Sequence, residues 1–418
     1  MTENDPADSP ERSQSGPGGG EPIDLDLSPH WSLESGVTYL NHGAFGACPK
    51  RIQHRHREWL DQLESQPVRF FGRELPGLID RARAELAEFV GSDHRNLAFV
   101  TNTTEGISAV LRSLDPGPGD ELLITDHTYG ACKNAVDFVA QQTGATVTVA
   151  TLPFPVDDQQ NVVAAILDCV TDDTRLALVD HITAFSGLVL PIADIVRALE
   201  ERGIDTLVDG AHAPGTVDLE LDDLDATYYV GNCHKWLCAP RGAAFLRVDD
   251  AHLNSVRPLA ISHGAGLEDP ERSRFHLEFD WTGTRDPSPW LCVPEVIQFL
   301  ASLVPDGWAG IRRRNRTIAI DARELLCETV DARRLCPDSM IGFTAAIELP
   351  KDGVELPSSP METDPLQDVL YSKYGIEVPI FAILEPRRRL LRISAHLYNQ
   401  PGDYERLADA LDVELNGS

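Results

Sequence analysis

The central part of the chain alternates short apolar runs with amphipathic stretches. The clearest amphipathic stretch is Pro191–Arg202, which Gly203 follows as a typical helix stop. Its aliphatic residues Ile192, Ile195 and Leu199 fall on one helical face. Strands that alternate with helices are typical of an α/β fold, so we predict a mainly parallel seven-stranded sheet with helices on both faces. The predicted strands are Leu97–Thr101, Glu121–Thr125, Thr146–Ala150, Leu176–Val179, Thr206–Val208, Thr227–Val230 and Ala243–Val248.

The pattern changes after about residue 295, where helical periodicity leads into short strand patterns. These segments are Val296–Leu303, Ile311–Cys327, Thr344–Glu348, Ile376–Ile380 and Leu390–Ser394. The first 28 residues are rich in Asp, Glu, Ser, Pro and Gly, which is typical of disorder. We therefore predict three parts: a disordered acidic tail (1–28), a large domain with an N-terminal arm (29–295) and a smaller α+β domain (296–418).

Composition limits the partners and the compartment. The 418 residues include 36 Lys and Arg against 66 Asp and Glu, a formal charge of −30. Nucleic acid and anionic membranes are bound by basic surfaces, so we expect neither as a partner. The chain has no apolar stretch of about 20 residues, begins without the apolar core of a secretory signal, and carries eight cysteines without framework spacing. We predict a cytoplasmic protein, whose acidity fits either high-salt adaptation or ordinary solubility.

Candidate chemistry lies where two of the predicted strands end. Asp209 follows Thr206–Val208 directly, and Lys235 comes 26 residues later, beyond Thr227–Val230. Ligands of parallel sheets bind beyond the carboxyl ends of the strands. Pyridoxal phosphate is an aldehyde that forms a Schiff base with a lysine amine, and a carboxylate keeps its ring nitrogen protonated. The pair therefore suits this cofactor; a structural ion pair is the alternative.

Further candidates surround that pair. Thr103 and Thr104 open a predicted helix, whose N-terminus would cradle the cofactor phosphate, although a plain helix cap explains them too. His234, next to Lys235, would reach the same phosphate. His127 follows a predicted strand and would stack on the cofactor ring; the alternative is a hydrogen-bonded loop histidine.

A metal site is the competing interpretation of the segment around Lys235. Cys233, His234 and Cys238 offer ligand atoms within a few residues of one another. A structural zinc site normally needs four ligands, often from two close pairs, and the sequence presents no second pair. We therefore expect no metal.

Eight segments, in order over about 360 residues, resemble one known superfamily. They are YLNHGAFGACP (39–49), QPVRFF (66–71), TNTTEGI (101–107), TDHTYGA (125–131), LVDGAHAPG (207–215), GNCHKWLCAPRGAAFL (231–246), WTGTRDPSPW (281–290) and LRISAHLYN (391–399). The chain resembles the class V aminotransferase superfamily of fold-type I pyridoxal phosphate enzymes, and within it the isopenicillin N epimerase-like branch.

The resemblance implies roles for the candidates around the cofactor. Lys235 would form the Schiff base and carry the proton at the substrate Cα. Asp209 would pair with the pyridinium nitrogen, and His212 would lie near the ring hydroxyl. The phosphate would be held by Thr103, Thr104 and His234.

The resemblance also implies substrate and subunit contacts. Thr284 would reach the cofactor phosphate of the partner subunit, so we expect a homodimer whose active site is completed by the partner. Arg392 would bind the α-carboxylate of an amino acid substrate, a task that suits a guanidinium fork. His42, in one of the matching segments, would either contact substrate as the acid on the face opposite Lys235 or pack at the subunit interface. Where relatives often carry Ser or Asn the chain has Ala184, and Thr183 or Ser186 would replace the lost contact.

Several reactions remain open on this scaffold. Epimerisation needs an acid opposite Lys235, β-elimination needs a leaving group on Cβ, and transamination moves the Cα proton to the cofactor. Cysteine desulfurases of this superfamily carry a cysteine shortly before the carboxylate-binding arginine, and Gly375–Leu391 contains none. We predict an epimerase-like enzyme acting at Cα. The alternatives are a C–S lyase (hercynylcysteine sulfoxide lyase-like or cysteine desulfurase-like), an aminotransferase and, from another class, a cofactor-free binding protein.

Overall fold

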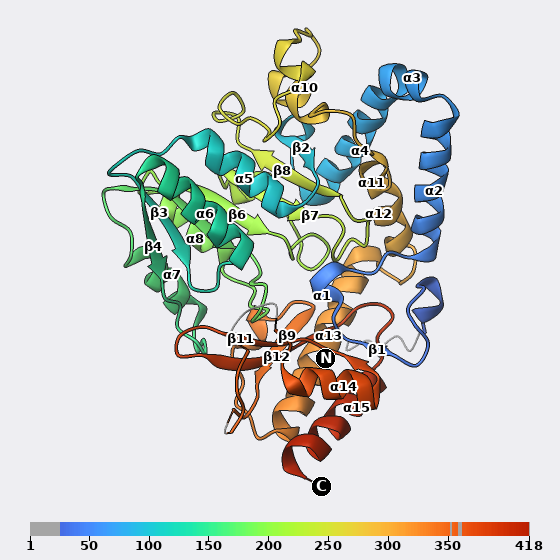
Figure 1. The fold of residues 1–418 in the computed structure, drawn as a ribbon, viewed down its shortest axis with the longest axis vertical. Coiled ribbons are helices and arrows are strands. Elements are labelled where there is room, and N and C mark those ends of the chain that lie inside the picture. Colours follow the sequence, from blue (N-terminus) through green and yellow to red (C-terminus); the bar gives the residue numbers. More distant parts are fainter. Residues whose placement is uncertain (1–25, 352, 358–361, 418) are drawn as a thin grey trace, which may run out of the picture.

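The computed structural model describes residues 26–351, 353–357 and 362–417. Figure 1 shows a wide upper part built on one large sheet and a narrower lower part that carries a second sheet and the C-terminus. The predicted disordered tail over 1–28 lies outside the described residues, apart from its last three positions. No helix within these ranges combines the length and apolarity needed to cross a bilayer.

Seven strands form the large sheet, in the order β2-β8-β7-β6-β5-β3-β4. β8 runs antiparallel to both of its neighbours, and every other neighbouring pair is parallel. The predicted mainly parallel seven-stranded sheet is therefore confirmed. The strands are β2 (Leu97–Val100), β3 (Glu121–Thr125), β4 (Thr146–Ala150), β5 (Thr174–Asp180), β6 (Asp205–Gly210), β7 (Tyr228–Asn232) and β8 (Ala244–Val248).

Alternate residues of the central strands enter two different hydrophobic cores. Leu178 and Leu207 belong to one cluster of buried side chains, and Val179 and Val208 belong to the other. Because side chains alternate across a strand, a strand that is buried on both faces reads as a continuous apolar run. This burial explains why short aliphatic runs were enough to predict the strands.

Helices cover both faces of the large sheet (Figure 1). α5 (Thr103–Leu114) and α6 (Gly130–Thr143) bury side chains in the first cluster, whereas α4 (Leu75–Val90) and α8 (Ile192–Glu200) bury theirs in the second. The remaining helices of the upper part are α1 (His42–Phe45), α2 (Lys50–Ser65), α3 (Pro67–Arg69), α7 (Gln159–Leu167), α9 (Leu221–Leu224), α10 (Arg274–Asp280), α11 (Ser288–Leu291) and α12 (Val293–Ala301).

The lower part contains an antiparallel sheet in the order β11-β12-β9. The segment Ile376–Ile380, predicted as a single strand, is divided into β10 and β11, because Pro379 has no N–H for a ladder hydrogen bond. The elements of this part are α13 (Gly307–Thr329), β9 (Thr344–Glu348), α14 (Pro365–Tyr374), β10 (Ile376–Glu377), β11 (Ile380–Ile383), β12 (Arg388–Ser394) and α15 (Pro401–Leu411).

The N-terminal arm connects the two parts of the molecule. Its strand β1 (Thr38–Tyr39) pairs in parallel with β10 of the lower part, while α2 packs on α11 of the upper part. The domain boundary expected between residues 295 and 296 falls inside α12 and stays a proposal.

Candidate active site

A cavity of about 320 Å³ lies at the carboxyl ends of the central strands, where α5 begins. Its walls come from the ends of β5, β6 and β7, from the turn after β3 and from the arm helix α1. This is the position at which parallel sheets bind ligands. The predicted site residues that line it are Thr103, Thr104, Asp209, His212, His234 and Lys235.

The amine of Lys235 forms a hydrogen bond with His212. Lys235 Nζ lies 2.9 Å from His212 Nε2, and Trp236 Nε1 donates to His212 Nδ1 at 3.2 Å. Because Nδ1 accepts, the neutral ring carries its proton on Nε2 and donates it to the amine. Burial lowers the pKa of Lys235 to about 8, although the negative charge of Asp209 acts to raise it. Burial also holds the pKa of His212 well below its usual value. The His212 ring is therefore neutral, and the lowered pKa of Lys235 raises the share of its neutral amine, the nucleophilic form, near neutral pH.

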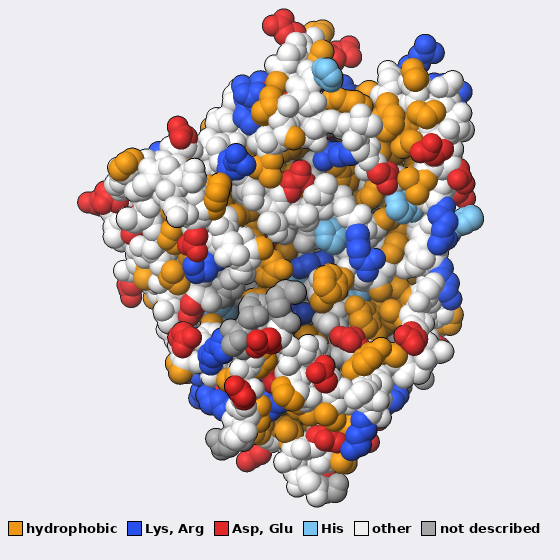
Figure 2. Space-filling model, in the orientation of Figure 1, with side chains coloured by type: hydrophobic (Ala, Val, Ile, Leu, Met, Phe, Trp, Pro, Cys, Tyr) orange, Lys and Arg blue, Asp and Glu red, His pale blue; other side chains and the backbone are white. Residues whose placement is uncertain are grey.

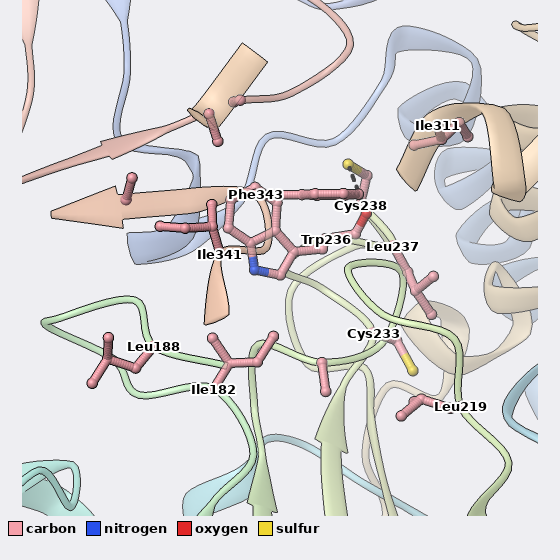
Figure 3. Packing of buried hydrophobic residues seen from close by; sticks show 14 of the residues in the cluster. Ile182, Leu188, Leu219, Cys233, Trp236, Leu237, Cys238, Ile311, Ile341 and Phe343 are labelled. Carbon is pink, nitrogen blue, oxygen red and sulfur yellow. Dashed lines mark hydrogen bonds between the residues drawn. The ribbon is translucent and has the colours of Figure 1, made fainter. Parts of the chain in front are cut away.

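Trp236 anchors the segment that carries this amine. Its buried indole meets Phe343 edge-on at 5.5 Å between ring centroids. Figure 3 shows it beside Phe343 and Ile341, which lie just before strand β9 of the lower part. The arm crosses the same segment at Gly46, whose φ is +69° and whose added Cβ would meet the His234 carbonyl oxygen at 2.3 Å. Only glycine fits this close approach.

Two buried carboxylates stand side by side on the cavity wall. Asp209 ends the apolar part of β6; its Oδ2 accepts from Cys132 Sγ at 3.2 Å and its Oδ1 from the Ala211 amide at 2.9 Å. Asp180 ends β5 and pairs in register with Asp209. Both line the cavity, so Asp180 is a site residue that the sequence analysis missed. The signal was present, because Asp180 follows the run Leu176–Val179 just as Asp209 follows its own strand.

The first turn of α5 forms another wall. Asn102 caps the helix by accepting from the Glu105 amide at 2.8 Å, and the Thr103 amide donates to Asn232 of β7 at 3.1 Å. His234 Nδ1 lies 2.8 Å from the Ala243 carbonyl oxygen, and burial lowers the pKa of this ring to about 4. The neutral ring therefore donates through Nδ1 and leaves Nε2 unprotonated. A phosphate at Nε2 would favour the protonated ring.

The predicted stacking residue His127 does not line the cavity. It is 3% exposed, its Nδ1 lies 2.8 Å from Ser186 Oγ, and its ring meets Phe154 edge-on. This placement matches the alternative of a hydrogen-bonded loop histidine. Tyr129, two residues later, lines the cavity instead and is 41% exposed.

Ala184, which stands where relatives often carry Ser or Asn, changes the character of the cavity wall. Ala184 lines the cavity, as does Ile182. Thr183 and Ser186, the expected replacements for the missing polar contact, are buried and hydrogen-bond each other at 2.7 Å. Neither is among the lining residues, so the wall here is apolar.

Arg392 approaches the cavity from strand β12. It is 3% exposed, donates to the carbonyl oxygen of the lining residue Ala184, and donates to Asn41 Oδ1 at 3.4 Å. Its guanidinium lies 5.1 Å from the ring centre of Phe381, and its buried Nε has no partner in the described structure. Burial lowers the pKa of Arg392 to about 10. A cation with an unused donor suits a carboxylate ligand.

His42 lies behind Lys235 rather than in the cavity. Its Nε2 lies 3.0 Å from the Lys235 carbonyl oxygen and its Nδ1 2.8 Å from Tyr398 Oη. Cys238 Sγ lies 3.3 Å from His396 Nε2, so these residues and His42 bring three possible metal-ligand atoms within 4.8 Å of one another. All three residues are buried; His42 and Cys238 also contact backbone oxygens of Lys235 and Trp236, whereas His396 Nδ1 has no partner in the described structure.

Thr284 lies in the exposed loop after α10 and does not line the cavity of its own chain. A role for Thr284 at a cofactor phosphate therefore depends on a partner subunit.

On the face shown in Figure 2, acidic side chains are interspersed with basic ones.

The residues present fit pyridoxal phosphate. The cavity has the size of a small-ligand site. Its low-pKa amine suits the aldehyde of the cofactor, and its two buried carboxylates suit the ring nitrogen. The helix N-terminus with its two threonines suits the phosphate. Asp180 Oδ2 is buried and without a partner in the described structure. A buried polar atom without a partner is expected where a polar ligand binds.

Known proteins with similar sequences are pyridoxal phosphate enzymes. The family model "Aminotransferase class-V" matches residues 38–333. Isopenicillin N epimerases of Streptomyces clavuligerus and Amycolatopsis lactamdurans are 34% and 35% identical to this chain, over 91% of it and 96% of each relative. A probable chloroplastic L-cysteine desulfhydrase of Arabidopsis thaliana is 30% identical, over 89% of this chain and 82% of its own length.

Solved structures share the fold. A cystine C–S lyase in complex with its product cysteine persulfide has a TM-score of 0.74 at 21% identity, covering 90% of this chain and 98% of its own. The cysteine desulfurase CsdA from Escherichia coli has a TM-score of 0.75 at 20% identity, covering 93% and 97%. The fold is thus the fold-type I architecture expected from the sequence. With the family model spanning most of its length, the chain belongs to the class V aminotransferase family of enzymes that use pyridoxal phosphate.

Proposed function

We propose that this pyridoxal phosphate-dependent enzyme removes and returns the proton at Cα of an amino acid, inverting that centre. The observation that carries the proposal is the environment of Lys235. Its buried amine bonds to His212 and has a pKa of about 8, which suits a base that works near neutral pH. The identity to two isopenicillin N epimerases favours this reaction.

Each wall of the cavity has a task in this proposal. When bound, pyridoxal phosphate supplies an electron sink that stabilises negative charge at Cα. Asp209 keeps a proton on the ring nitrogen, and His212 lies near the ring hydroxyl and orients the Lys235 amine. Arg392 binds the substrate α-carboxylate through its guanidinium. The phosphate is held by Thr103, Thr104 and His234.

Inversion also needs an acid on the face opposite Lys235. His42 is poorly placed for it, because its ring bonds the Lys235 carbonyl oxygen from behind. Tyr129 follows β3, two strands away from β6 in the sheet, and lines the cavity with a phenol hydroxyl, a group that can donate a proton. We therefore assign the opposite-face acid to Tyr129.

A C–S lyase is the second candidate. Two relatives named "Probable L-cysteine desulfhydrase, chloroplastic" and "Putative L-cysteine desulfhydrase 1" are 30% and 32% identical to this chain. β-Elimination begins with the same removal of the Cα proton. None of the described cavity-lining residues is a cysteine, so desulfuration through a protein thiol finds no support.

Completion of the site by a partner subunit is part of the proposal. Thr284 would reach the cofactor phosphate of a second copy, which makes the active unit a homodimer. Sedimentation of the purified protein should give a dimer, and Thr284→Val should weaken cofactor binding. A fully active monomer would contradict this part.

The reaction is tested by incubating the enzyme with single amino acids in deuterated water. Deuterium at Cα together with loss of chirality supports epimerisation. Release of pyruvate and ammonia supports elimination, and a keto acid with the aminated cofactor supports transamination. Tyr129→Phe should keep exchange in one enantiomer while inversion is lost. If Tyr129→Phe lowers the rates of Cα exchange and of inversion equally, Tyr129 is not the opposite-face acid.

A further inference from the structure

We propose that Asp180 is a second acid of the cofactor site, which shares one proton with Asp209 at the end of the cavity that takes the ring nitrogen. The inference rests on the proposed role of Asp209 at that nitrogen. It adds a residue from a neighbouring strand that belongs to none of the motifs recognised in the sequence.

The geometry begins with the register of the sheet. β5 and β6 are parallel neighbours, and Asp180 pairs with Asp209 across them. Side chains at paired positions of a sheet point to the same face. Both carboxyl groups therefore project beside each other, and both line the cavity although they are only 2% and 4% exposed.

Two carboxylates in such a place cannot both be ionised without enough positive charge nearby. The titratable groups that act on the pair are Lys235, from the connection after β7, and Cys132, from α6. Lys235 is the single cation among them, and burial already lowers its pKa to about 8. One negative charge on the pair is therefore the stable state at neutral pH.

The hydrogen bonds indicate which carboxyl group holds the proton. Asp209 accepts bonds from Cys132 Sγ and the Ala211 amide, and accepted bonds favour its ionised form. The Oδ2 of Asp180 is buried and has no partner in the described structure. Burial and the charge of Asp209 raise the pKa of Asp180 well above its ordinary value. Asp180 is thus the protonated acid and Asp209 the carboxylate.

This arrangement matches the charge of the ligand. A protonated ring nitrogen carries one positive charge, and the pair presents one negative charge to it. Asp180 acts as a positioning residue: as a neutral acid beside Asp209 it leaves the single negative charge of the pair on Asp209, next to the ring nitrogen. If Asp209 loses its negative charge, Asp180 gives up its proton and becomes the ionised carboxylate of the pair.

Infrared spectroscopy of the holoenzyme tests the shared proton directly. At neutral pH the wild-type protein labelled with ¹³C-aspartate should show the C=O stretch of a protonated carboxyl group that Asp180→Asn removes. Asp209→Asn should remove it too, because the acid at position 180 then ionises. Asp205→Asn is the matched control: Asp205 is half-buried at the other end of β6 and should leave the band unchanged. A wild-type spectrum without the band, or a band that survives Asp180→Asn, would overturn the proposal.

Cofactor affinity gives an independent test. Asp180→Asn alone should change the dissociation constant of pyridoxal phosphate little, because an amide replaces a neutral acid. In an Asp209→Asn background the same substitution should weaken binding by about tenfold, since the coupling between contacting groups reaches this size. Equal effects in both backgrounds would overturn the proposal. Neither readout depends on turnover, so failure of the epimerisation proposal would leave both measurements interpretable.

Discussion

The active site has two walls of different origin. The strand-end wall, made of Asp180, Asp209 and Lys235, comes from consecutive strands of one rigid sheet. The arm wall, formed by Ala44 and Phe45 and backed by Asn41 and Arg392, comes from opposite ends of the chain, and the contact between Asn41 and Arg392 spans 351 residues of sequence. The strand-end wall has the charges that suit the cofactor, whereas the arm wall has the cation that suits a substrate carboxylate. Cofactor binding should thus survive damage to the arm wall.

The largest effect is expected from removing the amine of the strand-end wall. Lys235→Ala should lower turnover by at least about 10³-fold, because both the covalent link to the cofactor and the base at Cα are lost. The visible absorption of the lysine-bound cofactor should disappear from the spectrum of the purified protein. Lys373→Ala, which removes an exposed partner of Glu414, is the control and should keep both. Turnover that persists in Lys235→Ala would contradict the assignment.

Arg392→Lys should break the arm wall alone. Lysine keeps the charge but loses the planar fork, so KM for the amino acid should rise by about 10- to 100-fold, the worth of a hydrogen bond to a charged group. Titration of pyridoxal phosphate should give an unchanged dissociation constant. Arg313→Lys, in a surface pair with Asp306, should change neither quantity. If cofactor affinity falls as much as substrate affinity, the two walls are not separable.

Gly46→Ala should disturb the junction between the walls. The substitution places a Cβ 2.3 Å from the His234 carbonyl oxygen at a φ of +69°, and we expect it to cost ~1–3 kcal/mol of unfolding free energy. Gly36→Ala is a matched control, because Gly36 has a φ of +88° but nothing within 4 Å of an added Cβ. It should cost only about 1 kcal/mol. If denaturant titrations give equal losses of unfolding free energy for Gly46→Ala and Gly36→Ala, the backbone relieves the clash at Gly46 and the prediction is wrong.

The smallest effect is a pH dependence of the strand-end wall. Only the neutral amine of Lys235 attacks an aldehyde, and its pKa is about 8 instead of the ordinary 10.5. From pH 7 to 9 its neutral fraction rises from about 10% to about 90%, so cofactor capture by the apoprotein should accelerate about tenfold and level off. Stopped-flow absorbance measures this rate. A rise of about 100-fold without levelling would mean an ordinary lysine.

The sequence predicted the strand-end wall better than the arm wall. The aliphatic runs located the seven strands, and Asp209, which follows one of them, could be assigned to the ligand-binding edge, whereas Asp180 in the equivalent place after another run was missed. His127 and His42 were harder. Whether the ring at position 127 or the one at Tyr129 turns into the cavity depends on packing against Phe154 and Ser186, which no local pattern encodes.

By itself, the sequence determined the alternation of strands and helices, and hence the large sheet with Asp209 and Lys235 at its edge, because local hydrophobic periodicity sets which residues are buried. Tertiary structure alone decided that Asp180 stands beside Asp209, that His42 lies behind Lys235, and that Arg392 reaches Ala184. These neighbours come from separate segments, and only the packing of the arm, the sheet and the C-terminal part brings them together.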